Sequence, residues 1–167
     1  MTVEQYLRTS FEGPDREFLD GEVVERNEGE LPHGLVQGEL VFLLRRLSPE
    51  LGLTVVPEIR LQVSPTRFRV ADVAAWRAGP IGTRIPAVPP FLVVEILSTE
   101  DRLTRMQPKI QEYLRLGVEH VWIVDPDERS ALSYTPAAAA GELVDELRTD
   151  DPPIEIRLAD LLRVLGA

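Results

Sequence analysis

The clearest hydrophobic pattern in the chain consists of two apolar runs and an amphipathic segment between them, over residues 91–126. Residues 91–98 and 121–124 are apolar on both faces of a pleat, with one exception, as is typical of strands covered on both sides. Between the runs, four residues recur at helical spacing and would form one inward face: Ile110, Tyr113, Leu114 and Gly117. Pro108 fits best in a first helical turn, so this helix is expected to begin near Met106. A strand, a crossover helix and a second strand predict a right-handed parallel unit.

The exception in the first apolar run is Glu95. An ionised carboxylate inside an apolar strand is unfavourable unless a cation, a metal ion or hydrogen-bond donors compensate it. Asp72 interrupts the apolar run over residues 68–76 in a similar way. Two explanations stay open for this pair: structural ion pairs, or adjacent strands that bring both carboxylates to one hard divalent cation such as Mg²⁺. For Asp72 a position at a strand end, facing water, is a further alternative.

The N-terminal segment predicts a short helix followed by a hairpin. Thr2 begins a capping-box pattern, which opens the helix. Residues 16–25 carry an Asp-Gly pair between two apolar-rich arms, which is a strong signal for a two-residue β-turn. Glu17 and Glu22 lie on these arms. Their spacing alone favours a solvated hairpin face for both acids.

A second, longer amphipathic helix is expected from His33 to near Pro49. His33 would be either a structural residue at the helix start or a site residue. A zinc site is disfavoured, because the only other histidine, His120, has no ligand spacing around it. The elements expected after this helix are, in chain order, strands over 53–63 and 68–76, a loop over 77–90 rich in Gly and Pro, the unit described above, a strand within 127–134, a strand around 143–147 and a closing helix near 158–165.

Composition narrows the class of protein. A chain of 167 residues fits a single domain, here residues 1–167, that buries a core of its own. The absence of cysteine excludes disulfides and thiolate zinc sites. No apolar run approaches the ~18 residues of a membrane helix, and the N-terminus lacks a signal-peptide pattern. We therefore expect a cytoplasmic protein without a membrane partner.

The charge is unevenly distributed along the chain. The net charge of −10 argues against a protein that binds nucleic acid with its whole surface. Residues 45–115, however, contain eleven basic and seven acidic residues, so the rest of the chain carries −14. Arg77 and Arg84 lie in the long loop over 77–90, and their guanidinium groups would suit contacts with the phosphate backbone of a nucleic acid. A solvated surface with chance clustering is the alternative.

Lys109 is the only lysine in the chain, and every other Lys or Arg position is arginine. It lies on the helix that follows Glu95. A composition biased so strongly to arginine could have supplied arginine here too. Lysine differs in carrying a compact ammonium with an adjustable pKa, so its presence indicates a specific role unless it occurs by chance.

Several strings of residues together resemble a known family. They are EFLDGEV in the hairpin, the helix that begins at His33, RVADV, VVEILS and PKIQEYLRLGVEHVWIVDP. With these strings the chain resembles the Uma2 family, a branch of the PD-(D/E)XK restriction-endonuclease-like superfamily, from about Thr2 to the closing helix. The most specific part of the resemblance is the arrangement of Lys109, Tyr113, Gly117 and Val118 ahead of VWIVDP.

The resemblance implies an α/β (α+β) fold with a restriction-endonuclease-like core, in which helices flank a mixed central sheet and a β-hairpin lies at the N-terminus. It also implies metal-dependent hydrolysis of phosphodiester bonds. Asp72 matches the aspartate of the first motif and Glu95 the acid of the second. The superfamily's lysine usually follows two residues later, where this chain has Leu97, so the lysine is expected at Lys109. The family's hairpin glutamate corresponds to Glu17.

These assignments give one main functional hypothesis. Asp72 and Glu95 would bind one or two Mg²⁺ ions, with Mn²⁺ as a substitute, and Lys109 would orient a water molecule or help to deprotonate it, and would stabilise the charged phosphate. Glu17 would act as an outer ligand or as a ligand of a second metal ion, and His33 as a neighbour that contacts nucleic acid, which we expect to be DNA. The alternative is a catalytically inactive nuclease-like fold that serves as a binding or regulatory module, including one that forms a homodimer.

Overall fold

A mixed β-sheet lies at the centre of the computed structural model, which describes residues 1–27, 29–101 and 103–166. Within these residues the strand order is β2-β1-β4-β5-β6-β7-β8, and β3 pairs with β4. The strands of this sheet are β1 Glu17–Leu19, β2 Glu22–Val24, β3 Thr54–Ser64, β4 Arg67–Trp76, β5 Leu92–Ile96, β6 His120–Asp125, β7 Ser130–Tyr134 and β8 Glu142–Leu143. The other elements are β9 Glu146–Thr149 and β10 Ile154–Arg157, which form a hairpin, and α1 Val3–Arg8, α2 Leu31–Leu51, α3 Leu103–Leu116, α4 Leu158–Leu161 and a 3₁₀ turn Leu162–Leu165.

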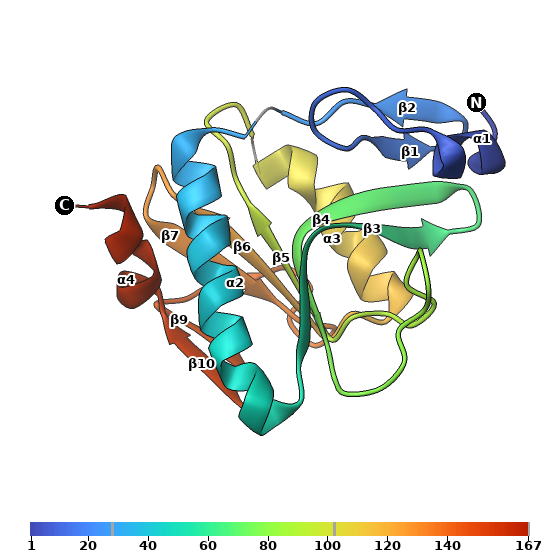
Figure 1. Ribbon diagram of the computed structural model, residues 1–167. Helices are drawn as coiled ribbons and strands as arrows, with labels where there is room; N and C mark the ends of the chain where they lie inside the picture. Colours follow the sequence, from blue (N-terminus) through green and yellow to red (C-terminus); the bar gives the residue numbers. More distant parts are fainter. Residues whose placement is uncertain (28, 102, 167) are drawn as a thin grey trace.

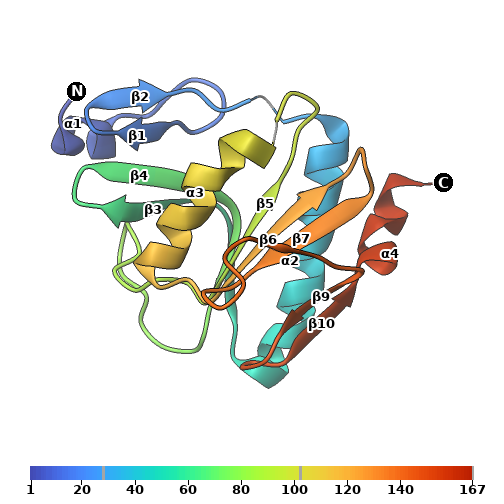
Figure 2. The same cartoon turned by 180° about the vertical axis from the view of Figure 1, so that it is seen from behind.

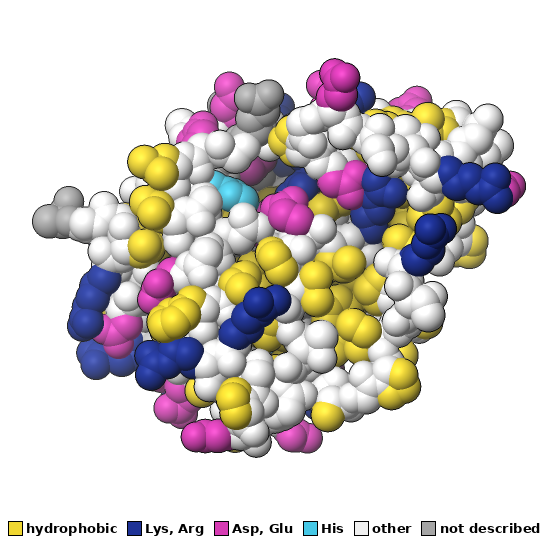
Figure 3. Space-filling model, viewed as in Figure 1, with side chains coloured by type: hydrophobic (Ala, Val, Ile, Leu, Met, Phe, Trp, Pro, Cys, Tyr) yellow, Lys and Arg dark blue, Asp and Glu magenta, His cyan; other side chains and the backbone are white. Residues whose placement is uncertain are grey.

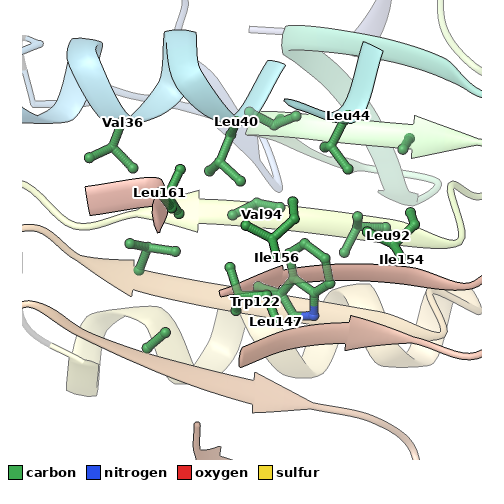
Figure 4. Packing of buried hydrophobic residues seen from close by; sticks show 14 of the residues in the cluster. Val36, Leu40, Leu44, Leu92, Val94, Trp122, Leu147, Ile154, Ile156 and Leu161 are labelled. Carbon is green, nitrogen blue, oxygen red and sulfur yellow. The ribbon is translucent and has the colours of Figure 1, made fainter. Parts of the chain in front are cut away.

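Helices cover both faces of the sheet. α2 lies on one face and α3 on the other, as the two opposite views show (Figures 1 and 2). On the α2 side, three apolar residues of this helix pack on the sheet and on the β9–β10 hairpin (Figure 4): Val36, Leu40 and Leu44. On the α3 side, Ile110 and Tyr113 pack against Val93 and Val121. The central strands are therefore buried on both faces, as their apolar runs predict.

The predicted parallel unit is confirmed. β5 and β6 pair in parallel, with Leu92 opposite His120, and α3 connects them. The β4–β5 and β6–β7 ladders are antiparallel, which makes the sheet mixed. The expected fold class, a mixed sheet flanked by helices with an N-terminal hairpin, is therefore confirmed.

The predicted starts of both long helices are two or three residues late. α3 begins at Leu103 rather than near Met106, and Pro108 lies inside it. The ring removes one hydrogen bond, to the carbonyl of Thr104, an exposed residue that water can reach. α2 begins at Leu31, two residues before His33, and ends at Leu51, near Pro49 as expected. Pro49 lies inside the last turn of α2, where its ring also removes one main-chain hydrogen bond.

The C-terminal region contains more strands than the pattern predicted. The single strand expected around residues 143–147 is divided between β8 and β9, and β10 was not predicted. None of the helices described is long and apolar enough to cross a membrane.

Candidate functional site

Asp72 and Glu95 lie on neighbouring antiparallel strands at the point where the β4–β5 ladder ends. Val73 pairs with Val94, and the two acids are the next residues along their strands. Both are buried, with 2% and 1% of their surface exposed. The Ile96 N–H donates a hydrogen bond to Asp72 Oδ2 at 2.8 Å, so this carboxylate takes the place of a main-chain acceptor. Asp72 therefore does not lie at a solvated strand end.

Glu95 receives two donors from α3. The Tyr113 hydroxyl donates to Oε1 at 2.7 Å, and Lys109 Nζ donates to Oε2 at 3.0 Å. Burial raises the pKa of Glu95 to about 8, although the positive charge of Lys109 opposes the rise. The carboxyl group can therefore gain or lose a proton near neutral pH.

Lys109 is the centre of the buried network. Its ammonium lies 2.8 Å from the Val70 carbonyl oxygen, 2.9 Å from Glu17 Oε1 and 3.0 Å from Glu95 Oε2. An ammonium has three N–H donors, so all of them have an acceptor. Burial alone would lower the pKa of Lys109, but Glu95 and Glu17 raise it above the ordinary value. Lys109 is thus a permanent cation.

Glu17 is buried on the hairpin and does not face solvent, so the solvated hairpin face predicted from spacing is wrong for this acid, whereas Glu22 is exposed. The β1–β4 ladder brings Glu17 next to Arg69, which donates to Oε2 at 2.7 Å, and the Val70 N–H donates to Oε1 at 3.1 Å. Burial opposes ionisation, but Lys109 and Arg69 together lower the pKa of Glu17 to about 2.

Two nitrogen-bearing side chains hold Asp72. Arg26 donates to Oδ1 at 2.7 Å, and His33 Nε2 lies 3.2 Å from Oδ2. Burial would raise the pKa of Asp72, but the hydrogen bond from His33 and the positive charge of Lys109 lower it. His33 comes from the first turn of α2, which explains why a histidine stands at that helix start. The pKa of His33 is raised by its hydrogen bond to Asp72.

Arg26 and Glu58 are site residues that the sequence did not indicate. Arg26 also donates to Glu58 Oε2 at 2.5 Å. Arg26 stands in a polar segment without periodicity, and Glu58 stands among alternating residues of β3 like any surface acid. No local signal in the sequence distinguishes either residue.

One hollow of about 440 Å³ is lined by the following of these side chains: Arg26, His33, Glu58, Asp72, Glu95 and Lys109. In the space-filling view, acidic, basic and histidine side chains gather at a recess beside the N-terminal end of α2 (Figure 3). Among the described residues, six carboxylates line the hollow: Asp15, Glu30, Glu58, Asp72, Glu95 and Asp101. Within that same set, only Arg26 and Lys109 offset them, apart from His33. The hollow therefore attracts cations and repels phosphate unless further positive charge is added.

The two arginines predicted to contact phosphate lie elsewhere. Arg77 forms a two-pronged ion pair with Glu119, at 2.9 and 2.8 Å, stacks over Phe91 and does not line the hollow. Arg84 lines an adjoining groove of about 1160 Å³, which shares Asp15 and Glu58 with the hollow. The structure therefore brings His33, but not Arg77, to the acids.

The type of donor in the hollow fits a hard divalent ion. Carboxylate oxygens are the ligands that Mg²⁺ and Mn²⁺ prefer. In residues 1–27, 29–101 and 103–166, however, no group of three or more acidic or histidine side chains is arranged to hold a metal ion. Side-chain donors engage the oxygens of Asp72 and Glu95 instead. A metal ion at these acids would have to displace one of these donors.

Comparison with known proteins identifies relatives of this chain. The model of the Uma2 family, described as "putative restriction endonuclease", matches residues 3–163. Among solved structures, a "putative nuclease belonging to DUF820" from Anabaena variabilis superimposes with a TM-score of 0.85 at 20% sequence identity, covering 99% of each chain. At this identity the likeness shows the fold alone. Comparison with curated proteins gives no match.

Proposed function

Because the chain belongs to the Uma2 family, we propose that it is a metal-dependent endonuclease of the PD-(D/E)XK type that hydrolyses phosphodiester bonds of nucleic acid, with DNA as the expected substrate. One observation carries the proposal. Asp72, Glu95, Lys109 and Glu17 come from four different elements, and the last three meet in one buried network beside Asp72 at the hollow.

Each of these residues has a distinct task in the proposed reaction. Asp72 and Glu95 would hold Mg²⁺, or Mn²⁺ in its place, which when bound lowers the pKa of a water molecule and offsets charge on the phosphate. Lys109 orients the carboxylates of Glu95 and Glu17 by donating to both. Its raised pKa keeps it protonated, which favours stabilisation of the charged phosphate over general-base assistance.

The second layer of the site fixes these groups. The phenol of Tyr113 holds the second oxygen of Glu95, and Arg69 holds the second oxygen of Glu17. Both acids are therefore kept in one orientation by groups that come from the sheet and from α3. Lys109 takes the place of the lysine that usually lies two residues after the second acid, because Leu97 occupies that position.

The substrate would reach the acidic hollow from the adjoining groove. Arg84 lines that groove, and among the described residues it forms no ion pair, so its guanidinium is available to a phosphate. Arg77 is already neutralised by Glu119 and is the weaker candidate. Nucleic-acid binding would thus depend on a few phosphate contacts and on cations inside the hollow.

A catalytically inactive binding module is the competing function. It is favoured by the side-chain donors that already satisfy Asp72 and Glu95, since such a network needs no metal ion. In this case the protein would bind nucleic acid or a second copy of itself without cleaving anything.

Cleavage and metal binding separate the two functions. The purified protein is incubated with supercoiled plasmid, single-stranded DNA and RNA in Mg²⁺ or Mn²⁺, and Mn²⁺ binding is titrated by calorimetry. Glu95→Gln and Asp72→Asn should abolish cleavage and weaken Mn²⁺ binding, whereas Glu22→Gln on the exposed arm of the hairpin should change neither. Parental protein that binds DNA but cleaves none of the substrates with either ion would favour the binding module.

A further inference from the structure

Arg26 lies in the hollow as a cation shared by two acids. It follows β2, in the segment that leads to α2, and only 15% of its side chain is exposed. One nitrogen of its guanidinium donates to Asp72 Oδ1 at 2.7 Å and another to Glu58 Oε2 at 2.5 Å. Arg26 therefore bridges a metal-ligand candidate and an acid from the neighbouring strand.

The position of Glu58 is fixed by the fold. Pro57 pairs with Val73 and Ile59 with Ala71, so Glu58 lies across from Asp72. Its backbone has a φ of 50°, which non-glycine residues seldom adopt inside a strand.

Gln37 of α2 holds the two acids together from the other side. Its side-chain amide donates to Glu58 Oε1 and to the Asp72 carbonyl oxygen, each at 2.8 Å. The bracket that receives the guanidinium of Arg26 is thus built from β3, β4 and α2, and Gln37 holds its exposed member, Glu58, in place.

We propose that Arg26 occupies the place that a divalent ion would take on Asp72, and that metal binding transfers its guanidinium from the two carboxylates to a phosphate of the substrate. The inference rests on the proposed function. Asp72 Oδ2 already accepts from the Ile96 N–H and from His33. The less engaged oxygen is Oδ1, which carries Arg26. An ion that approaches this oxygen meets a like charge within bonding distance.

A displaced guanidinium has a suitable new partner nearby. Its planar fork matches two oxygens of a phosphate, as it does those of a carboxylate. Arg26 lines the hollow, so its displaced guanidinium would remain close to a phosphodiester that enters there. The exchange would also make the hollow less negative, because a bound metal ion would offset the charge of the acids while Arg26 becomes available to the substrate.

Transfer of Arg26 couples the two ligands. Metal binding would release the residue that binds phosphate, and phosphate binding would hold it away from Asp72. By linkage, each ligand then raises the affinity for the other by the same factor. An arginine with a purely structural role would show no such coupling.

The experiment compares the parent with Arg26→Ala. The matched control is Arg67→Ala, because Arg67 also bridges two carboxylates, Asp20 and Glu112, but lies outside the hollow. Calorimetry with Mn²⁺ should show about tenfold tighter binding in Arg26→Ala, since a like charge beside the ion has been removed, and less than a twofold change in the control. Unchanged or weaker Mn²⁺ binding in Arg26→Ala would overturn the proposal.

A second measurement tests the transfer itself. The affinity for a fluorescent DNA duplex is measured by anisotropy with and without Ca²⁺, used as a non-cleaving divalent ion. In the parent, Ca²⁺ should strengthen binding about tenfold or more, whereas in Arg26→Ala the gain should fall below twofold. A gain of the parental size in the variant would overturn the proposal.

Two further results keep these outcomes distinct. If Arg26→Ala does not fold, as judged by circular dichroism, Arg26→Met replaces it, because methionine keeps much of the volume without the charge. The absence of Mn²⁺ binding in both parent and variant would refute the proposed metal dependence, and the inference with it. Mn²⁺ binding that is tight in the parent and independent of Arg26 would refute the inference alone.

Discussion

Replacing Lys109 by methionine would remove the one cation that Glu17 and Glu95 share. All three side chains are at most 9% exposed, so none can be rescued by water without rearrangement. Removing one partner of a buried ion pair costs about 3–5 kcal/mol, because the remaining charge stays buried and uncompensated. Methionine is similar in length and unbranched, so the loss of charge dominates over the loss of packing.

The two acids contribute unequally to this cost. Because the pKa of Glu95 is raised to about 8, this carboxyl group is largely protonated at pH 7, and loss of Lys109 leaves little uncompensated charge on it. The pKa of Glu17 is lowered from 4.5 to about 2, and Lys109 shares that effect with Arg69. A shift of this size corresponds to about 3 kcal/mol in total, at about 1.4 kcal/mol for each pKa unit. Because Arg69 supplies part of that stabilisation, we expect Lys109→Met to lower the free energy of unfolding by about 1.5–3 kcal/mol, a large part of a typical domain stability.

Urea unfolding followed by circular dichroism at pH 7 measures this effect. A double-mutant cycle with Glu17→Gln should show that the double variant loses less than the sum of the single variants, by about 1 kcal/mol or more. Arg115→Met on the same helix is the control, because Arg115 is exposed and its side chain hydrogen-bonds, among the described residues, only to the Gln111 carbonyl. A loss below about 1 kcal/mol in Lys109→Met, or strict additivity in the cycle, would refute the reasoning.

Three further predictions follow from the pKa values and from the arginines. Since the pKa of Glu17 is lower in the folded protein than the unfolded value of 4.5, its contribution to stability is present above pH 4.5 and is lost as the pH falls towards 2; Glu17→Gln should flatten the melting temperature over this range. Glu95 holds its proton up to about pH 8, and a bound metal ion would have to displace that proton. The Mn²⁺ affinity measured by calorimetry should therefore increase as the pH is raised towards 8, by up to about tenfold for each pH unit, and a flat profile would exclude Glu95 as a ligand. In salt titrations of DNA binding, Arg84→Ala should reduce the slope by about 1, whereas Arg77→Ala should leave it unchanged.

Much of the fold could be predicted from periodicity. Residues 91–98 and 121–124 are apolar on both pleat faces, and the helix between them is amphipathic. A buried parallel unit covers both strands and the apolar face of the helix at once, so this packing could be predicted. The convergence of Asp72 and Glu95 could be anticipated for a related reason. A carboxylate inside an apolar strand must be compensated, and two such acids on successive strands share a neighbourhood.

The rest of the site depends on contacts between segments that lie far apart in the sequence. Arg26 reaches Asp72 only because the segment after the hairpin passes close to the middle of β4, and nothing near residue 26 indicates this path. Glu58 lies across from Asp72 because of the pairing register of β3 and β4, which a pattern of alternating residues does not reveal. The spacing within the hairpin predicts that Glu17 faces solvent, because it shows only local neighbours. The burial of Glu17 follows instead from the β1–β4 ladder, a contact between distant segments.

The distribution of partners in the hollow bears on how a metal ion would enter. Lys109 is surrounded by three acceptors and is buried, and its removal would leave two acids unpaired inside the protein. Glu58, one of the two acceptors of Arg26, is 42% exposed, so water can replace that bond, and the incoming ion would itself compensate the buried Asp72. Displacing Lys109 therefore costs more free energy than displacing Arg26. A divalent ion that must remove one cation would accordingly enter at Asp72, on the side of the hollow that Arg26 covers, while Lys109 keeps Glu95 in position for it.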